Sequence, residues 1–194
     1  MFETLSEKDE AANNAIFRTA VTLAVVGAAN PIPLVGDVGI VLAGWGRMLF
    51  YMANLYEAHY DKNWLLKALA EVFKSLGWYA VSTTIFIGAI ELAKFTGVGT
   101  ISSMIMSALF NACFTFAVGN MYKEAWRIGE EPTEAQLSSA IRSSIEYVQS
   151  RNVRQKAREV YSNARKEGLS REDSLKEVVK EIPPGIGHTT VGHR

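Results

Sequence analysis

Residues 95–122 read FTGVGTISSMIMSALFNACFTFAVGNMY, and this stretch contains no Asp, Glu, Lys, Arg or His. An uncharged helix of this length can cross the hydrocarbon core of a bilayer, which needs about 20 apolar residues. A helix of a soluble domain usually carries charges on its solvent side. Serines, two asparagines and Gly119 make the stretch more polar than a uniform apolar run. It therefore favours bilayer contact, with the core of a soluble helical bundle as the alternative.

The two parts of the chain differ in composition. The 20 basic and 20 acidic residues and the mean hydropathy of +0.06 are averages over both parts. Residues 11–122 hold nearly all the long apolar runs, whereas residues 123–194 are rich in Lys, Arg and Glu. The acidic and polar N-terminus is unlike the basic start of a secretory signal, so we do not expect export. The single cysteine, Cys113, excludes an internal disulfide and is expected to be a small buried hydrophobic residue.

Proline, glycine and short polar segments divide the apolar part into four predicted helices. The first ends before Pro31 and Pro33, because proline lacks an amide donor and pushes the preceding residue out of the α region. The last ends at Gly129. No run of strand-like alternation interrupts them, so we predict an all-α fold of two helical hairpins plus amphipathic C-terminal helices. The four apolar helices are expected at about residues 9–30, 38–60, 64–94 and 100–127.

Charge is distributed unevenly along the two predicted hairpins. If consecutive helices pair in antiparallel fashion, most charged side chains lie toward the open ends of the hairpins. The tips, NPIPLVGD at residues 30–37 and KFTGVG at residues 94–99, are poor in charge. Hairpins with polar bases and apolar tips resemble segments that insert into a membrane from one face. The predicted membrane-inserting residues are Pro31, Ile32, Pro33, Leu34, Val35, Gly97, Val98 and Gly99.

Helix length limits how deeply the hairpins could insert. The apolar legs of the first hairpin measure about 14 to 17 Å, roughly half of a hydrocarbon core. Residues 75–90 give the second hairpin a leg of about 24 Å, so we expect it to reach deeper. One pattern favours a soluble bundle instead: Ser103, Ser107, Asn111 and Thr115 recur every fourth residue and could form a polar stripe. The same stripe would also suit a contact between helices in lipid.

The C-terminal part predicts three amphipathic helices. A capping box opens the first at Thr133, a second runs from about Val153 to Lys166, and a third follows Ser170. Each has an apolar stripe that must be buried against the bundle or a partner. We therefore divide the chain into an apolar two-hairpin domain (residues 1–128), an amphipathic helical appendage (129–185) and a disordered tail (186–194).

Basic residues are concentrated on two of the amphipathic helices. Such a cluster can bind anionic head groups or nucleic acid, or simply be a solvated helix face. Only Tyr147 and Tyr161 lie among the basic residues, which does not favour nucleic acid. The predicted basic surface comprises Arg142, Arg151, Arg154, Lys156, Arg158, Arg165 and Lys166.

No motif with an established chemistry occurs in the sequence. The Walker A phosphate loop, the H-E-x-x-H metal motif, the C-x-x-C pair and the G-x-S-x-G elbow are all absent. His188 and His193 lack a nearby acidic or thiol partner that would favour a metal site. We therefore predict no catalytic residues, no metal and no cofactor, and we expect a protein that is not an enzyme.

Two motifs resemble the helical family called domain of unknown function 697. Residues 28–37, AANPIPLVGD, are similar to its opening segment, and TGVGTI at residues 96–101 with FAVGN at residues 116–120 is similar to its closing helix. The resemblance covers about residues 15–128. It implies association with bacterial small GTPases and frequent location in membranes. Because this chain shows no GTPase domain, the resemblance implies a GTPase that acts in trans, and it transfers no catalytic residues.

Three functional hypotheses follow. The first is a membrane-associated module that inserts its hairpins from the cytoplasmic side, at the inner membrane in a bacterium, and anchors or serves a protein partner such as a GTPase. The second is a soluble helical adaptor or oligomer, with a cytoplasmic location. The third is a pore-forming or membrane-remodelling protein. A lipid bilayer and a protein are the expected partners, self-association is left open, and nucleic acid is not expected.

Overall fold

The computed structural model describes residues 4–29, 38–75 and 99–182, and within these ranges every regular element is an α-helix. This confirms the predicted all-α fold. The helices are α1 (Leu5–Ala29), α2 (Val38–Tyr56), α3 (Lys62–Ser75), α5 (Gly99–Arg127), α6 (Glu134–Gln149), α7 (Arg151–Lys166) and α8 (Arg171–Glu181).

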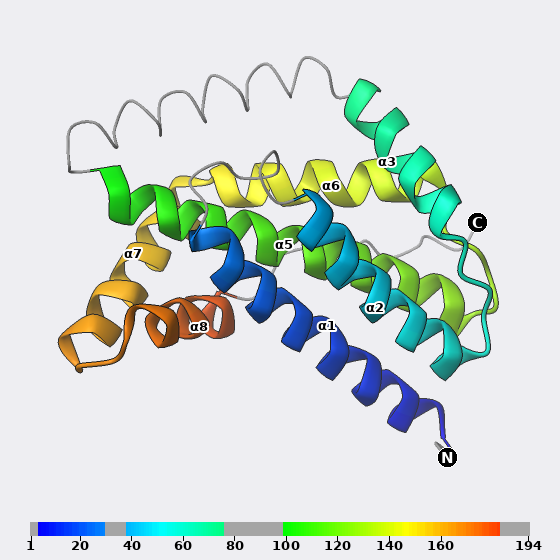
Figure 1. Cartoon of the computed structure of the whole chain (residues 1–194), viewed down its shortest axis with the longest axis horizontal. Helices are drawn as coiled ribbons and strands as arrows, with labels where there is room; N and C mark the ends of the chain where they lie inside the picture. The colour runs from blue at the N-terminus through cyan, green and yellow to red at the C-terminus, as the bar shows by residue number, and fades with distance from the viewer. Residues whose placement is uncertain (1–3, 30–37, 76–98, 183–194) are drawn as a thin grey trace.

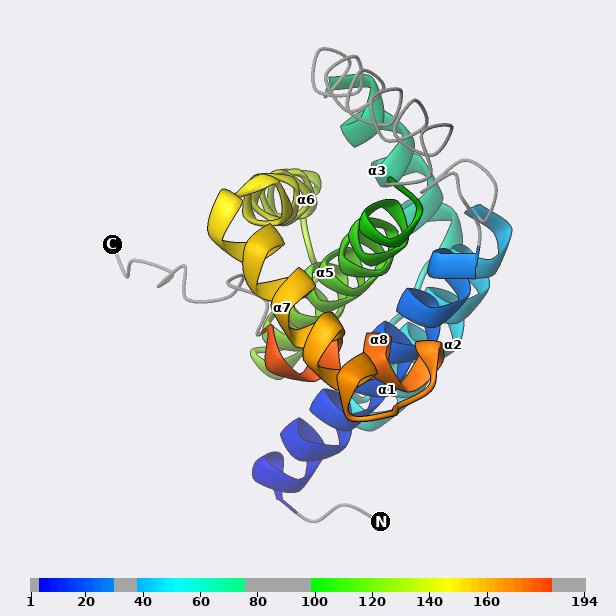
Figure 2. The ribbon, with the colours of Figure 1, turned by 90° about the vertical axis from the view of Figure 1, so that its left-hand side faces the viewer.

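Helix α5, which contains the uncharged stretch up to Tyr122, lies at the centre of the molecule (Figures 1 and 2). Helices α1 and α2 pack on one side of it, and α6, α7 and α8 pack on the other sides. Helix α1 runs antiparallel to α5, since Gly27 lies beside Ser107 and Ile16 lies against Gly119. Helix α2 returns antiparallel to α1, which brings Gly44 against Leu23. The first predicted hairpin, α1 and α2, therefore packs against α5, the fourth predicted helix.

Local signals account for where the helices begin and end. Helix α1 begins at Leu5, earlier than predicted, because Thr4 and Glu7 form a capping box with backbone-to-side-chain distances of 3.1 and 3.2 Å. Helix α2 ends at Tyr56, earlier than predicted, because Glu57 has a φ of 57°. The amide of Ala58 then donates to the carbonyl of Ala53, as in a Schellman motif with Glu at the glycine position.

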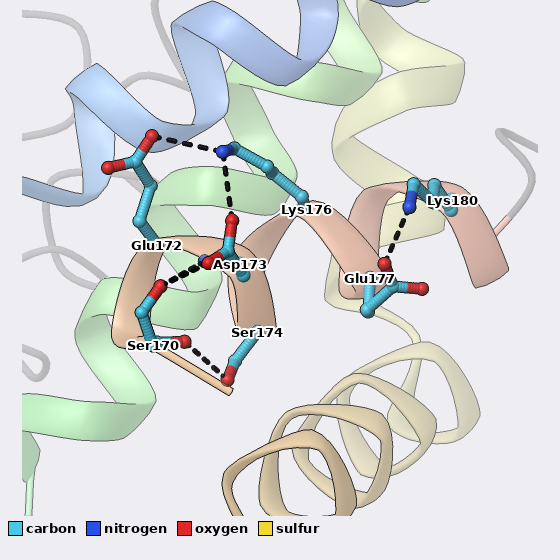
Figure 3. Close-up of polar contacts among 7 residues, drawn as sticks. All are labelled: Ser170, Glu172, Asp173, Ser174, Lys176, Glu177 and Lys180. Carbon is cyan, nitrogen blue, oxygen red and sulfur yellow. Dashed lines mark hydrogen bonds and ion pairs between the residues drawn. The ribbon is translucent and has the colours of Figure 1, made fainter. Parts of the chain in front are cut away.

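The C-terminal helices have the predicted caps and buried stripes. Thr133 and Gln136 form the expected capping box, and the Ser170 hydroxyl accepts from the amide of Asp173 at the start of α8 (Figure 3). Gly168 has a φ of 86° after α7, a left-handed conformation that glycine adopts without strain and that ends the helix. The buried stripes of α6 and α8 are Leu137, Ile141, Ile145, Val148, Leu175, Val178 and Val179.

One buried cluster joins residues from the apolar part and from the C-terminal helices. It includes Leu109 and Tyr122 of α5 together with Leu137 and Val178. Gly99 is the first residue of α5 rather than part of the turn before it. The other predicted tip residues, residues 76–94 of the third predicted helix, and residues 186–194 with their two histidines lie outside the described residues.

Candidate functional site

Helix α5 is covered on nearly every side. All residues from Met104 to Thr115 are buried, and so are Ala117 and Val118. Residues Met104–Arg127 form one helix that is long and apolar enough to cross a membrane, and 83% of its most apolar window is buried within the structure. A core helix of a soluble protein passes the same test of length and composition. The missing charges of α5 are therefore explained by its neighbours in the bundle.

The part of the predicted polar stripe whose side chains the structure describes, Ser107, Asn111 and Thr115, forms a seam between helices. The Ser107 hydroxyl donates to the carbonyl oxygen of Gly27 on α1, with an O–O distance of 2.7 Å. The indole N–H of Trp45 on α2 donates to the hydroxyl of Thr115 at 3.0 Å. Both contacts are buried, so Ser107 holds α1 and Thr115 holds α2 in register with α5.

Asn111 lies between these two contacts and fits tightly against α1. Its side-chain N–H donates to the carbonyl of Ser107 at 3.1 Å. A Cβ atom built on Gly27 would lie 1.8 Å from Asn111 Nδ2, so only glycine allows this approach of the two helices. The seam is close-packed and holds α1, α2 and α5 together.

Cys113 faces the opposite side of α5, toward α6. It is 3% exposed, and burial raises the pKa of its thiol to about 12. The hydroxyl of Ser144 on α6 lies 3.5 Å from its carbonyl oxygen. The thiol is neutral near pH 7, so Cys113 is the buried hydrophobic residue that the sequence predicts and is not an activated nucleophile.

The C-terminal end of α5 contains an aromatic cluster beside an acidic hollow. Tyr122 lies within 4.8 Å of Trp126 and 6.2 Å of Trp64, measured between ring centroids. The Tyr122 hydroxyl and the Trp126 indole nitrogen are buried without a hydrogen-bond partner among the described residues, and burial raises the pKa of Tyr122. The hollow has a volume of about 240 Å³ and is lined by Tyr56, Glu57, Ala58, His59, Trp126, Gly129, Glu130 and Glu131.

Charged side chains tie the helices together at this same end. The Tyr56 hydroxyl donates to the carboxylate of Asp9 at 2.7 Å, and Arg127 forms an ion pair with Asp9 at 3.2 Å. Burial and the carboxylate of Asp9 both raise the pKa of Tyr56. Lys8 and Glu57 form a second bridge from α1 to the end of α2. Sequence analysis places charges at the open ends of the hairpins but does not pair them.

The predicted basic surface is divided between two helices. Arg142 lies on α6, where it is exposed, and the other six residues lie on α7. No ion pair joins those six α7 cations to an acid within the part of the chain that the structure describes. The neighbouring acids of α8 bind its own lysines instead, Glu172 and Asp173 with Lys176 and Glu177 with Lys180 (Figure 3). The positive charge of α7 is therefore left largely uncompensated.

Helix α7 lies near the end of the molecule at which α5 begins. Helix α6 runs back along α5, so the chain enters α7 beside the N-terminal half of α5 (Figures 1 and 2). Arg171, which follows α7, places its guanidinium against the sulfur of Met104. Ile101, in the first turn of α5, is 59% exposed. An exposed apolar residue and the basic helix thus lie at the same end, a juxtaposition that the sequence alone does not indicate.

Comparison with protein families identifies the chain. A family model for the domain of unknown function DUF697 matches residues 2–158. The chain belongs to the DUF697 family. The match extends beyond residues 15–128, on which the resemblance rested, and reaches into α7. No curated protein and no solved structure matched the chain. Among the described residues of this DUF697 protein, no three His, Cys, Asp or Glu side chains are grouped so that they could hold a metal ion.

Proposed function

We propose that this DUF697 protein is a membrane-associated helical module that docks on the cytoplasmic face of a bilayer, the inner membrane in a bacterium. The main support is the position of two exposed isoleucines. Ile40 in the first turn of α2 is 49% exposed, and Ile101 in the first turn of α5 is 59% exposed. Ile40 lies three residues after the predicted tip at residues 30–37, and Ile101 lies two residues after the predicted tip at residues 94–99. Exposed apolar side chains beside apolar segments favour membrane contact.

The packing of α5 favours docking over a complete span by this helix. Its neighbours α6, α7 and α8 expose charged side chains such as Glu134, Arg158 and Glu172. Moving each such charge into the hydrocarbon would cost about 2.5 to 3.5 kcal/mol. In the arrangement described here, α5 therefore belongs to a bundle on the membrane surface, and the apolar segments that precede α2 and α5 supply the contact with acyl chains.

We further propose that the module serves a protein partner, with a small GTPase acting in trans as the candidate. The support is the family resemblance together with the exposed C-terminal helices, which leave a large polar surface for a partner. Purification from native membranes with a tag on the protein should recover a GTPase, and chemical crosslinks should map to α6–α8. Recovery without any GTPase would remove this candidate partner.

Vesicle flotation of the purified full-length protein tests the membrane proposal. The protein should float with liposomes, and the double variant Ile40→Ser/Ile101→Ser should float less. Ile128→Ser is the matched control, because Ile128 is 66% exposed but follows the opposite end of α5. A wild-type protein that stays at the bottom of the gradient would contradict membrane association.

The burial of α5 specifically favours a second candidate, a soluble helical adaptor or oligomer. In that case the protein is monodisperse without detergent, and the isoleucine variants change self-association instead of flotation. Light scattering combined with size-exclusion chromatography of the wild type and the Ile101→Ser variant distinguishes the two candidates.

A further inference from the structure

Four arginines form one edge of α7, and we propose that this arginine edge binds the phosphate groups of anionic phospholipids. Arg151, Arg154, Arg158 and Arg165 are separated by three, four and seven residues, which keeps their side chains on one side of a helix. The edge is about 21 Å long at about 1.5 Å per residue. The inference rests on the proposed membrane association and specifies the lipid class that the module prefers.

The arginine edge has no acidic partner in the described chain. The one acid of α7, Glu159, accepts from Gln155 on its own helix. Arg165 donates to a backbone carbonyl, that of Leu169, which leaves its charge uncompensated. Arg154 Nε is buried and has no hydrogen-bond partner among the described residues. Arg151, Arg158 and Arg165 are exposed, so their guanidinium groups can form charge-assisted hydrogen bonds with an external anion.

Three acids of α8, the helix that packs against α7, form ion pairs with lysines of α8 itself. Figure 3 shows Lys176 between Glu172 and Asp173, and Lys180 against Glu177. Asp173 also binds the cap hydroxyl of Ser170, and its pKa is lowered by the Ser170 and Lys176 contacts. Although α7 and α8 pack against each other, no ion pair in the described part of the chain joins an acid of α8 to the arginine edge. The unmet positive charge is available to an external anion.

The position of α7 favours a lipid phosphate as that anion. The helix lies beside the N-terminal half of α5, the end at which Ile101 is exposed (Figure 2). A module that docks through this end brings α7 close to the head groups, where each basic residue gains from the negative surface potential. Arginine also suits phosphate because its planar guanidinium donates two parallel hydrogen bonds.

Nucleic acid fits the edge less well. Binding of single strands commonly uses aromatic side chains on which bases stack. Tyr161, the aromatic residue of α7, is buried in the bundle, and Tyr147 on α6 is partly buried and packs against the core. The edge therefore offers charge without a stacking surface, as expected for a surface that recognises head groups.

Flotation with two kinds of vesicle tests the inference on the full-length protein. One set contains only phosphatidylcholine, and the other contains about 30% phosphatidylglycerol, a typical anionic head group. The variant Arg151→Gln/Arg158→Gln/Arg165→Gln should bind the anionic vesicles about 100-fold more weakly than the wild type, at about one kcal/mol for each basic residue. The control Arg18→Gln/Arg47→Gln/Lys62→Gln removes the same charge from exposed positions on other helices and should bind nearly as the wild type does.

The outcomes separate this inference from the proposed function. If the wild type binds both vesicle types equally and the arginine variant binds as the wild type does, the proposed binding of anionic lipids by the arginine edge is overturned. The proposed membrane association is not affected by that result. A wild type that binds neither vesicle would overturn both. Displacement by polyglutamate or RNA with no preference for anionic vesicles would assign the edge to an acidic protein or nucleic acid and overturn the lipid assignment.

A further measurement covers the case in which the glutamine variant does not fold. The Arg151→Lys/Arg158→Lys/Arg165→Lys variant keeps the charge, and it should retain most of the binding to anionic vesicles. Binding of the wild type should also fall steeply as salt is raised, because salt screens exposed charges. Salt-independent binding to anionic vesicles would overturn the inference without any variant.

Discussion

Helices α5 and α7 bury their side chains in opposite ways. Helix α5 has no charge between Gly99 and Tyr122 and is covered by neighbours on nearly every side. Helix α7 buries only Ala157, Tyr161 and Ala164 and exposes a dense set of cations. Helix α5 is a central helix that contacts its neighbours through apolar, small and polar side chains. Helix α7 is an outer helix that contacts the bundle through one stripe of buried residues.

The contrast shows that an uncharged sequence does not by itself identify what surrounds a helix. Lipid and protein both accept an apolar side chain, so composition does not distinguish them. The distinction comes from the polar atoms. Ser107 and Thr115 of α5 meet Gly27 and Trp45 on other helices, at distances typical of good hydrogen bonds.

The largest expected effect comes from removing a core side chain of α5. Leu109→Ala should lower the free energy of unfolding by about 2 to 5 kcal/mol, because it leaves a cavity among buried neighbours. Ile101→Ala, on the same helix but exposed, should change it by less than about 0.5 kcal/mol. Urea denaturation followed by circular dichroism measures both. Equal losses would mean that α5 is not buried as described.

The second prediction concerns the close approach of α1 to α5. Gly27→Ala should destabilise the protein by about 1 to 3 kcal/mol, because the new methyl group displaces the buried amide of Asn111. Gly46→Ala is the control within α2, where a Cβ meets only the Tyr60 hydroxyl at 3.9 Å. That change should stabilise the helix by up to about 1 kcal/mol. Thermal denaturation of both variants measures these changes. A gain of stability in both would show that α1 and α5 do not approach each other closely at Gly27.

A third prediction tests the bond between α2 and α5. Thr115→Val should cost about 1 to 3 kcal/mol, because the buried indole N–H of Trp45 then lacks an acceptor. In a double-mutant cycle, Trp45→Phe should make the second substitution less costly. Thr22→Val provides the exposed comparison, since its hydroxyl bonds only to the backbone of Arg18. Strict additivity in the cycle would show that the two side chains do not interact.

The smallest effect is expected at the start of the polar half. Thr133→Ala should lower stability by about 1 kcal/mol, because the amide of Gln136 loses its cap at the beginning of α6. Thr133→Ser keeps the hydroxyl and should retain most of the stability. Urea denaturation of the pair checks this, and a larger loss in the serine variant would indicate a role for the threonine methyl group instead.

The C-terminal helices could be predicted closely because their patterns are local. Leu137, Ile141 and Ile145 recur at helical spacing, and Thr133 and Ser170 stand at capping positions, so both the elements and their buried faces follow from the sequence. The capping box of Thr4 and Glu7 is a local signal of the same kind, and it explains why α1 begins at Leu5 and not near residue 9 as predicted.

The surroundings of α5 could not be predicted, because they depend on contacts between distant residues. Ser107 and Gly27 are 80 positions apart, and no local pattern joins them. The spacing of Arg151, Arg154, Arg158 and Arg165 already predicts that they share one side of a helix, but the position of that helix beside the start of α5 depends on how α6 and α7 pack on α5. Arg142 lies apart from that edge on α6.

Ser150 ends α6 and also begins α7, so no linker separates the two helices. Its amide donates to Tyr147 and its hydroxyl accepts from Val153. Inserting a single residue after Ser150 would turn all of α7 by about 100° about its own axis. Each arginine side chain of α7 would then face a different direction, although the net charge and composition of the protein would hardly change. The absence of any residue between the two helices therefore determines which way the arginine side chains of α7 face.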